Sequence, residues 1–424
     1  MDYPAYPVYR ESGIEWLGKI PDHWEVRRLK FVAEIQNGRD YKEVESSEGY
    51  PVFGSGGVFR FATEYLYDGE SVLFGRKGTI DKPLYVNEKF WTVDTMFYSV
   101  ILEQTHGRFL YFFATTLQFN LLATQTALPS ITQTDLGNYL ISYPTYQEQQ
   151  TIAQFLDYKT QQIDQLIAKK RTLIDRLNEQ RIALITHAVT KGLNPAVTLK
   201  DSGVEWLGKV PKHWQQRRLK FVVQNITDTE HKTAEYFEDG EYLVVRTTNV
   251  RNGKLILDKA KYTNQDTYEE WTRRAKPKAG DILFTREAPA GETCIVPDDI
   301  KLCIGQRMVL FQFDKTSMNP IFLLNSLHAG LADEFIKKLS LGSTVAHFNM
   351  SDIQNIPVFV PNIKEQNDIA VYLDKETARI DRMVELNKQT IDKLKEYRTA
   401  LITAAVTGKI DLRNWQQEAN HANP

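Results

Sequence analysis

Arginine, asparagine, glutamine, serine and threonine side chains gather in the glycine- and threonine-rich turns of two segments, 32–146 and 222–363, of this 424-residue chain. The first three types can form two hydrogen bonds to the edge of a DNA base, and the hydroxyl groups suit phosphate oxygens. As a group these turns predict contacts with DNA, although ordinary polar loop surface is the simpler explanation for any single residue. The candidates in the first segment are Arg60, Arg76, Lys77, Thr79, Gln125, Ser130, Thr132 and Gln133. Those in the second segment are Arg246, Thr247, Asn249, Arg251, Arg286, Gln306, Arg307, Ser343, Thr344, His347 and Asn349.

The sequence shows no catalytic motif beside these turns. It contains no GxxxxGK[ST] nucleotide loop, no GxSxG or HExxH motif and no paired Cys/His spacing. The string NPIF at 319–322 lacks the second proline of a methyltransferase motif. His23 and His213 stand in identical contexts beside tryptophan without further metal ligands, so we expect them to pack or to cap. We therefore expect no catalytic residue, no metal and no cofactor in this chain.

The elements that must position the turns are repeated. Residues 11–31 (ESGIEWLGKIPDHWEVRRLKF) and 201–221 (DSGVEWLGKVPKHWQQRRLKF) are identical at 15 of 21 positions, at a constant offset of 190. Residues 148–190 match residues 365–407 at an offset of 217, whereas the segments between these blocks share no comparable identity. The sequence thus predicts an internal duplication, in which a constant frame carries two diverged modules. The RRLK tetrad in each copy is either a phosphate contact or a solvated strand flank.

The closing blocks carry a helical pattern, with apolar side chains in a heptad seam that keeps the same register in both copies. The seam residues are Ile163, Ile167, Ile174, Leu177, Leu184 and Ala188, and then Ile380, Val384, Ile391, Leu394, Leu401 and Ala405. Lys170 and Asn387 occupy corresponding polar positions, as do Arg181 and Arg398. About 28 residues of helix extend about 42 Å, and we expect the two seams to pair as an antiparallel coiled coil. A shorter amphipathic helix is expected before each long one, at 148–157 and 365–374.

The two diverged segments predict mixed α/β modules. Alternating runs such as VFRF and PLYV indicate strands, and the stretches 107–124 and 319–339 indicate a helix in each module. The linker 191–200 resembles residues 1–10, and residues 406–415 match its start, so the end of the chain is expected to return to its beginning. The predicted fold class is therefore α+β, with two modules separated by the antiparallel coiled coil, an internal pseudo-two-fold and a circular arrangement.

Composition limits the possible functions. No apolar run approaches the about 18 residues of a membrane span, and no secretory signal is visible. Cys294 and Cys303 are the only cysteines, which favours reduced thiols in the cytoplasm. The net charge is −2, and the segments 32–146 (8 Lys+Arg, 13 Asp+Glu) and 222–363 (16 against 19) carry −5 and −3. Contact with DNA must then come from local basic patches or from the charge of a partner, because phosphate contacts dominate affinity.

The repeats and loops resemble those of the specificity subunits of type I restriction-modification enzymes. The resemblance rests on the duplicated SGxEWLGKxPxHW…RRLKF block, the EQ…IA…LD…ID…ALIT…AVT helices, and the loops TREAPAGE and GSTVAHFNMSDIQNIPVFVP. It implies one target recognition domain at 1–146, a central conserved helical region at 147–200, a second recognition domain at 201–363 and a C-terminal conserved helical region at 364–424. Each recognition domain would read one half of an asymmetric split site through the major groove, and the helices would set the unread spacer.

The resemblance also implies partners for the chain. Two methyltransferase (M) subunits would dock mainly on the helical regions and use S-adenosylmethionine to methylate adenine. Two restriction (R) subunits, dependent on ATP and Mg²⁺, would add cleavage and translocation. The expected partners are therefore double-stranded DNA and these subunits in the cytoplasm, with no membrane, and this chain would be a non-catalytic recognition subunit.

Other function classes stay open on the residues alone. A helical adaptor with two protein-binding modules and no DNA role fits the acidic modules, but not the Arg/Thr/Gln-rich turns. An enzyme fused to recognition modules would need the motifs that the sequence lacks. A DNA-mimicking inhibitor would need a far more concentrated negative charge than −2.

Overall fold

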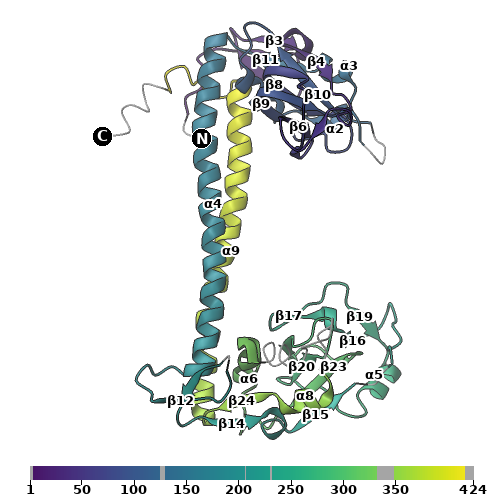
Figure 1. The fold of residues 1–424 in the computed structure, drawn as a ribbon, viewed down its shortest axis with the longest axis vertical. Helices are drawn as coiled ribbons and strands as arrows, with labels where there is room; N and C mark the ends of the chain where they lie inside the picture. Colours follow the sequence, from purple (N-terminus) through teal and green to yellow (C-terminus); the bar gives the residue numbers. More distant parts are fainter. Residues whose placement is uncertain (1–2, 125–128, 206, 230–231, 332–347, 416–424) are drawn as a thin grey trace. The chain divides into compact units, whose positions relative to one another are not determined.

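The computed structural model describes residues 3–124, 129–205, 207–229, 232–331 and 348–415. Their contacts divide the chain into two units, Met1–Arg171 with Asn387–Pro424 (unit 1) and Thr172–Leu386 (unit 2). Each unit contains one diverged module, one copy of the repeated block, and part of both long helices (Figure 1).

The module of unit 1 is built on a seven-stranded sheet of order β4-β10-β8-β9-β6-β7-β5, in which only the β6–β9 pair is parallel. Phe74, Phe90 and Phe97 are fully buried along it, and helix α1 packs against β8 and β9. The VFRF run lies in β7 and the PLYV run overlaps β9, which confirms both predicted strands. The elements are β4 (Ala33–Asn37), β5 (Glu45–Ser46), β6 (Tyr50–Gly54), β7 (Gly57–Ala62), β8 (Tyr67–Gly75), β9 (Leu84–Thr92), β10 (Met96–Ile101), α1 (Gly107–Ala114), α2 (Phe119–Leu122) and α3 (Gln133–Asn138).

The module of unit 2 has a four-stranded sheet of order β15-β23-β20-β21 and a three-stranded sheet of order β19-β16-β22 with a parallel β16–β22 pair. Phe284 and Phe311 are fully buried in its core. The elements are β15 (Asn225–Asp228), β16 (Tyr242–Val245), the 3-10 turn Thr247–Asn249, β17 (Val250–Arg251), β18 (Lys254–Leu255), β19 (Lys261–Thr263), α5 (Gln265–Trp271), β20 (Ile282–Thr285), β21 (Thr293–Ile295), β22 (Leu302–Ile304), β23 (Met308–Gln312), α6 (Pro320–Ser326) and α8 (Met350–Asn355).

The predicted helix at 107–124 is wrong as one element, because the chain breaks after α1. The hydroxyl groups of Thr115 and Thr116 donate to the carbonyls of Phe112 and Phe113 (2.7 Å each), which competes with continuation of the helical ladder. The predicted helix at 319–339 begins as α6 and continues in a π-helical turn, Leu327–Leu331. The rest of that stretch lies outside the described residues.

The repeated block folds in the same way in both units. It forms a short hairpin, a strand that pairs with the last strand of the module, and a 3-10 turn around a fully buried Trp24 or Trp214. In unit 1 these elements are β1 (Tyr9–Glu11), β2 (Lys19–Pro21), β3 (Glu25–Arg28), Leu29–Phe31 and β11 (Leu140–Tyr143). In unit 2 they are β12 (Leu199–Asp201), β13 (Lys209–Pro211), β14 (Gln215–Arg218), Leu219–Phe221 and β24 (Pro357–Val360).

The long helices α4 (Tyr146–Lys191) and α9 (Ile363–Val406) are continuous over 46 and 44 residues. The separate short helices expected at 148–157 and 365–374 are therefore wrong. No glycine or proline interrupts either helix. The hydroxyl groups of Thr160 and Thr377 donate hydrogen bonds to the carbonyls four residues earlier in the same helix. At about 1.5 Å per residue each helix extends about 65–70 Å.

The two helices pack side by side within each unit (Figure 1). In unit 1 Arg398 Nε donates to Asp164 (3.1 Å) and Lys170 Nζ donates to Asn387 (3.0 Å), so the two helices run antiparallel there. In unit 2 Arg181 Nε donates to Asp381 (3.1 Å). Buried seam positions are Ile163, Ile167, Leu177, Ala188, Ile380, Ile391, Leu401 and Ala405, and half-buried ones are Ile174, Leu184, Val384 and Leu394.

A glutamate in the first turn of each long helix joins that helix to the repeated block. Glu148 accepts hydrogen bonds from His23 Nε2 (2.9 Å) and Trp24 Nε1 (3.3 Å). Glu365 accepts the equivalent bonds from His213 Nε2 (2.8 Å) and Trp214 Nε1 (3.1 Å). Both histidines are exposed (43% and 48% of the side chain) and hydrogen-bond to a carboxylate at the start of a helix, which agrees with the predicted capping role rather than with packing in a core.

The glutamine that follows each glutamate joins the helix to the module. Gln149 Oε1 accepts from the backbone N–H of His106 (2.8 Å), and its Nε2 donates to the carbonyls of Gln104 (3.2 Å) and Pro144 (3.0 Å). Gln366 makes the same set of bonds, to the N–H of Asn319 (2.8 Å) and to the carbonyls of Ser317 (3.4 Å) and Pro361 (3.0 Å). We call Glu148–Gln149 and Glu365–Gln366 the Glu–Gln joints.

The joint in unit 1 makes stability depend on pH. Burial acts to raise the pKa of Glu148, but hydrogen bonds from His23, Thr145 and Trp24 outweigh burial and lower this pKa below 4.5. A carboxyl group whose pKa is depressed in the folded state stabilises the protein above its unfolded pKa, and this stabilisation is lost as the pH falls through the folded pKa. The contribution of Glu148 is therefore present at neutral pH and lost below about pH 4.5.

We expect Glu148→Gln to remove this contribution. The carboxamide cannot accept all the donors of the carboxylate, so the melting temperature at neutral pH should fall by about 4–8 °C, or about 2 kcal/mol. Calorimetry as a function of pH should show a flatter loss of stability in acid than in the parent protein. Glu179→Gln, at an exposed position of the same helix, is the control. If the melting temperature of the variant fell with decreasing pH as steeply as that of the parent, the role of Glu148 would be contradicted.

Candidate nucleic-acid interface

Three of the polar turns of unit 1 meet at one corner of its sheet, at Arg76, Thr95 and Ile131. The backbone N–H of Arg76 donates to the carbonyl of Thr95 (2.8 Å), and its carbonyl accepts from the N–H of Ile131 (3.0 Å). The turn after β8 thereby lies between the turn before β10 and the segment that leads into α3. A bridge between Lys77 and Ser130 extends this contact. Candidates from two distant stretches of sequence are thus brought together.

The module of unit 2 has the same corner. The N–H of Arg286 donates to the carbonyl of Arg307 (2.8 Å), and the carbonyl of Arg286 accepts from the N–H of Phe348 (3.0 Å). In both modules the residue after this backbone donor caps a short helix. The side chain of Thr132, after Ile131, accepts from the third N–H of α3 (3.1 Å), and that of Asn349, after Phe348, accepts from the third N–H of α8 (2.9 Å). We call these equivalent sites the module corners.

The sequence predictions did not align the two corners, although a weak signal is present. The strings LFGR (73–76) and LFTR (283–286) end the equivalent strands, and TDLGN (134–138) and SDIQN (351–355) form the equivalent short helices. Backbone hydrogen bonds define the corner, and such bonds place few demands on residue type. The corner could therefore persist while the side chains around it diverged.

The exposed polar side chains differ between the two corners. The predicted residues that are exposed at the corner of unit 1 are Lys77, Thr79, Thr132 and Gln133, and those at the corner of unit 2 are Gln306, Arg307 and Asn349. Arg307 keeps 56% of its side chain exposed while it pairs with Glu287. Gln133 also bonds inside the module, since its Nε2 donates to the carbonyl of Ile35 and its Oε1 accepts from Asn37 Nδ2 (3.3 Å). One backbone arrangement thus carries two different sets of polar side chains, and base readout requires such a difference.

The guanidinium of Arg286 makes its hydrogen bonds inside the module. Its guanidinium donates to Asp228 (Nη1–Oδ2 2.8 Å) and to the carbonyl of Phe348 (Nε–O 3.1 Å), and only 13% of its side chain is exposed. Arg286 therefore holds the corner from inside. The equivalent Arg76 is more open, with one hydrogen bond to the carbonyl of Asp94 (3.3 Å).

Several other candidates make internal bonds outside the corners. Asn249 is fully buried and bonds the backbone of Arg246 and Ile256, while Arg251 donates to the carbonyl of Thr247. Arg60, on β7, pairs with Glu45 (3.1 Å). Gln125, Ser343, Thr344 and His347 lie outside the described residues.

Metal and thiol chemistry find little support. Within the described ranges, no group of three or more His, Cys, Asp or Glu side chains could hold a metal ion. Burial raises the pKa of Cys294 and of Cys303 to about 12, and both are free thiols. No helix in the part of the chain that the structure describes is long and apolar enough to cross a membrane.

Comparison with known proteins gives a family. The profile of the type I restriction modification DNA specificity domain matches residues 21–176 and 211–396, that is, both halves of the chain. The chain belongs to this family. Relatives include the specificity subunit of the type I restriction enzyme MjaVIII of Methanocaldococcus jannaschii, 25% identical over 93% of this chain and 95% of that protein. The EcoBI specificity subunit of Escherichia coli is 21% identical over 96% and 90%.

Solved structures of the family share the fold of this specificity-domain protein. A chain from a study of the assembly and conformational transition of the type I R-M system matches with a TM-score of 0.70 and 16% identity, over 92% of this chain and 99% of that one. The HsdS subunit from Thermoanaerobacter tengcongensis matches with a TM-score of 0.55 and 17% identity, over 92% and 98%. The mixed α/β class and the duplication are therefore confirmed, and the family assigns the chain to DNA recognition rather than to catalysis.

The module corner of unit 2 allows a prediction about the free energy of unfolding. Arg286→Ala should lower the stability of unit 2 by about 3–5 kcal/mol, because it leaves the largely buried Asp228 without its main cation. The double variant Arg286→Ala/Asp228→Ala should recover part of this loss, as measured by thermal unfolding. If Arg286→Ala kept its stability and lost affinity for DNA, Arg286 would instead be a contact residue.

Proposed function

We propose that this chain is the specificity subunit of a type I restriction-modification complex, in which each module reads one half of a bipartite, asymmetric DNA site. The main support for this proposal is the pair of module corners. Their backbone hydrogen bonds are equivalent, but the side chains around them differ in type. Bases are distinguished in the major groove by the pattern of donors and acceptors that meets them. One frame with two different corners therefore fits two different half-sites. The exposed corner residues are the proposed DNA contacts.

The paired helices α4 and α9 act in this proposal as an antiparallel coiled coil that sets the unread spacer. The buried seam and the ion pairs between the helices in each unit support this role. The Lys170–Asn387 bond (3.0 Å) is a polar pair within an apolar seam, the kind of contact that fixes register. The seam of about 28 residues, or about 42 Å, compares with about 34–36 Å for one turn of B-DNA.

The division into recognition domains at 1–146 and 201–363 and helical regions at 147–200 and 364–424 belongs to the same proposal. So do the pseudo-two-fold and the circular arrangement. Contacts within unit 1 support the latter, since the N–H of Asp411 donates to the carbonyl of Pro4 (2.7 Å) and Lys409 Nζ to that of Leu17 (2.9 Å).

Partner subunits supply the reaction in this proposal. Two methyltransferase subunits carry S-adenosylmethionine and dock mainly on the helical regions, and two restriction subunits bring ATP and Mg²⁺, all in the cytoplasm. The negative charge of both modules, −5 and −3, supports a need for partner cations at the DNA backbone. The isolated chain should therefore bind its site more weakly, and with a shallower salt dependence, than the assembled complex.

Methylome sequencing tests the proposed function directly. Deleting the gene should remove one bipartite adenine-methylated motif from the host genome, and replacing residues 32–146 with the module of another family member should change one half of that motif only. If deleting the gene removed no methylated motif, the result would favour the adaptor function. A change in both halves would contradict the assignment of one module to each half-site.

A further inference from the structure

The two most exposed aromatic side chains among the described residues are the same residue of the repeated block. Phe31 is 61% exposed and Phe221 is 64% exposed. Each ends the sequence RRLKF, which is identical in the two copies. The core does not account for these rings, unlike the buried Trp24 and Trp214 of the same block.

Both rings are presented on the same turn. Leu29 and Leu219, which begin the two 3-10 turns, are almost fully buried (1% and 0% exposed). Their N–H groups donate to the last module segment, at the carbonyls of Tyr139 (2.8 Å) and Ile356 (2.9 Å). Each turn is thus fixed at its first residue and displays phenylalanine at its last. We call these two sites the RRLKF turns.

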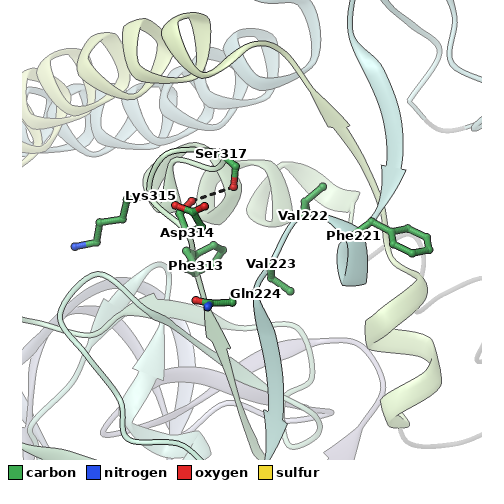
Figure 2. A pocket seen from close by; sticks show the side chains of 8 residues that line it. All are labelled: Phe221, Val222, Val223, Gln224, Phe313, Asp314, Lys315 and Ser317. Atoms are coloured by element: carbon green, nitrogen blue, oxygen red, sulfur yellow. Dashed lines mark hydrogen bonds between the residues drawn. The ribbon is translucent and has the colours of Figure 1, made fainter.

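A lysine lies beside each ring. Lys30 Nζ lies 5.4 Å from the ring centroid of Phe31, and Lys220 Nζ lies 5.2 Å from that of Phe221. Arg28 and Arg218, at the end of the preceding strands, are exposed. In unit 2 the ring also borders a surface hollow of about 440 Å³, and Figure 2 shows it directed away from Phe313 and Val223, which line the same hollow. Each exposed ring therefore has a lysine beside it, and in unit 2 the hollow is also lined by Asp314 and Lys315.

The duplication identifies the kind of partner. The two module corners differ, as two different half-sites require, but the RRLKF turns are equal and so fit two copies of one partner. A phenyl ring offers nothing to a phosphate, whereas aromatic residues that enter an apolar pocket are typical anchors of protein interfaces. The lysine beside each ring, Lys30 or Lys220, is complemented by acidic side chains at the edge of that pocket.

We propose that each RRLKF turn is a docking site that inserts Phe31 or Phe221 into an acid-rimmed apolar pocket on one methyltransferase subunit. This inference rests on the proposed function, which provides two copies of that subunit, and it adds a contact outside the long helices. The two sites act as equal and separate anchors, one in each unit.

Binding of the methyltransferase subunit to the full-length chain tests the inference. Native mass spectrometry should show two subunits on the parent protein. Phe31→Ala or Phe221→Ala should weaken the binding of one copy about 10- to 100-fold, and the double variant should weaken both. Phe59→Ala, on β7 and 44% exposed, is the matched control and should bind two copies as the parent does. Melting temperatures should match the parent, because the altered rings are exposed.

The outcomes separate the docking site from the proposed function. If the parent chain bound no methyltransferase subunit, both the proposed function and the docking site would fail. If the double variant bound two copies with unchanged affinity, only the docking site would be overturned. Unchanged subunit binding together with weaker binding of a random-sequence duplex would overturn it too, and would make the RRLKF turns a DNA contact.

Discussion

The rest of the structure depends on the hydrogen bonds that two equivalent carboxylates, those of Glu148 and Glu365, accept from the repeated block. Each accepts bonds from a histidine and a buried tryptophan of the repeated block, and each stands in the first turn of a long helix. A largely buried carboxylate is costly to leave unpaired, so these bonds specify one attachment between block and helix rather than a range of them. The direction of each helix relative to its own module follows from that attachment.

The module corners obey a different rule. Their geometry is fixed by main-chain bonds from Arg76 to Thr95 and Ile131, and from Arg286 to Arg307 and Phe348. A main-chain bond constrains the path of the backbone while leaving the side chain free. The side chains can therefore diverge at the corner while the corner itself is kept. Under the proposed function, this separation of path and side chain would allow one fold to read unrelated bases.

The sequence predicted the features that repeat or alternate. The duplication predicted two equal blocks, alternation predicted the strands β7 and β9, and the absence of accompanying ligands predicted that His23 and His213 cap or pack, of which the structure shows capping. The sequence did not predict the break at Thr115, which depends on the carbonyl that the threonine hydroxyl meets. The continuity of α4 past Thr160 was missed, although the absence of glycine and proline from residues 146–191 is visible in the sequence. Among the candidate contacts, the internal role of Arg286 comes from Asp228, 58 residues away, and a local pattern cannot reveal such a partner.

The Glu–Gln joints would let one module replace another without rebuilding the frame. On the frame side the bonds are made by particular side chains, His23 with Trp24 and His213 with Trp214. On the module side the glutamines bond only backbone atoms, at Gln104 and His106 in unit 1 and at Ser317 and Asn319 in unit 2. A new module meets these bonds if its chain follows the same path, whatever its residues are. Selection for a new target can thus act on the side chains of the module without disturbing the attachment that orients it.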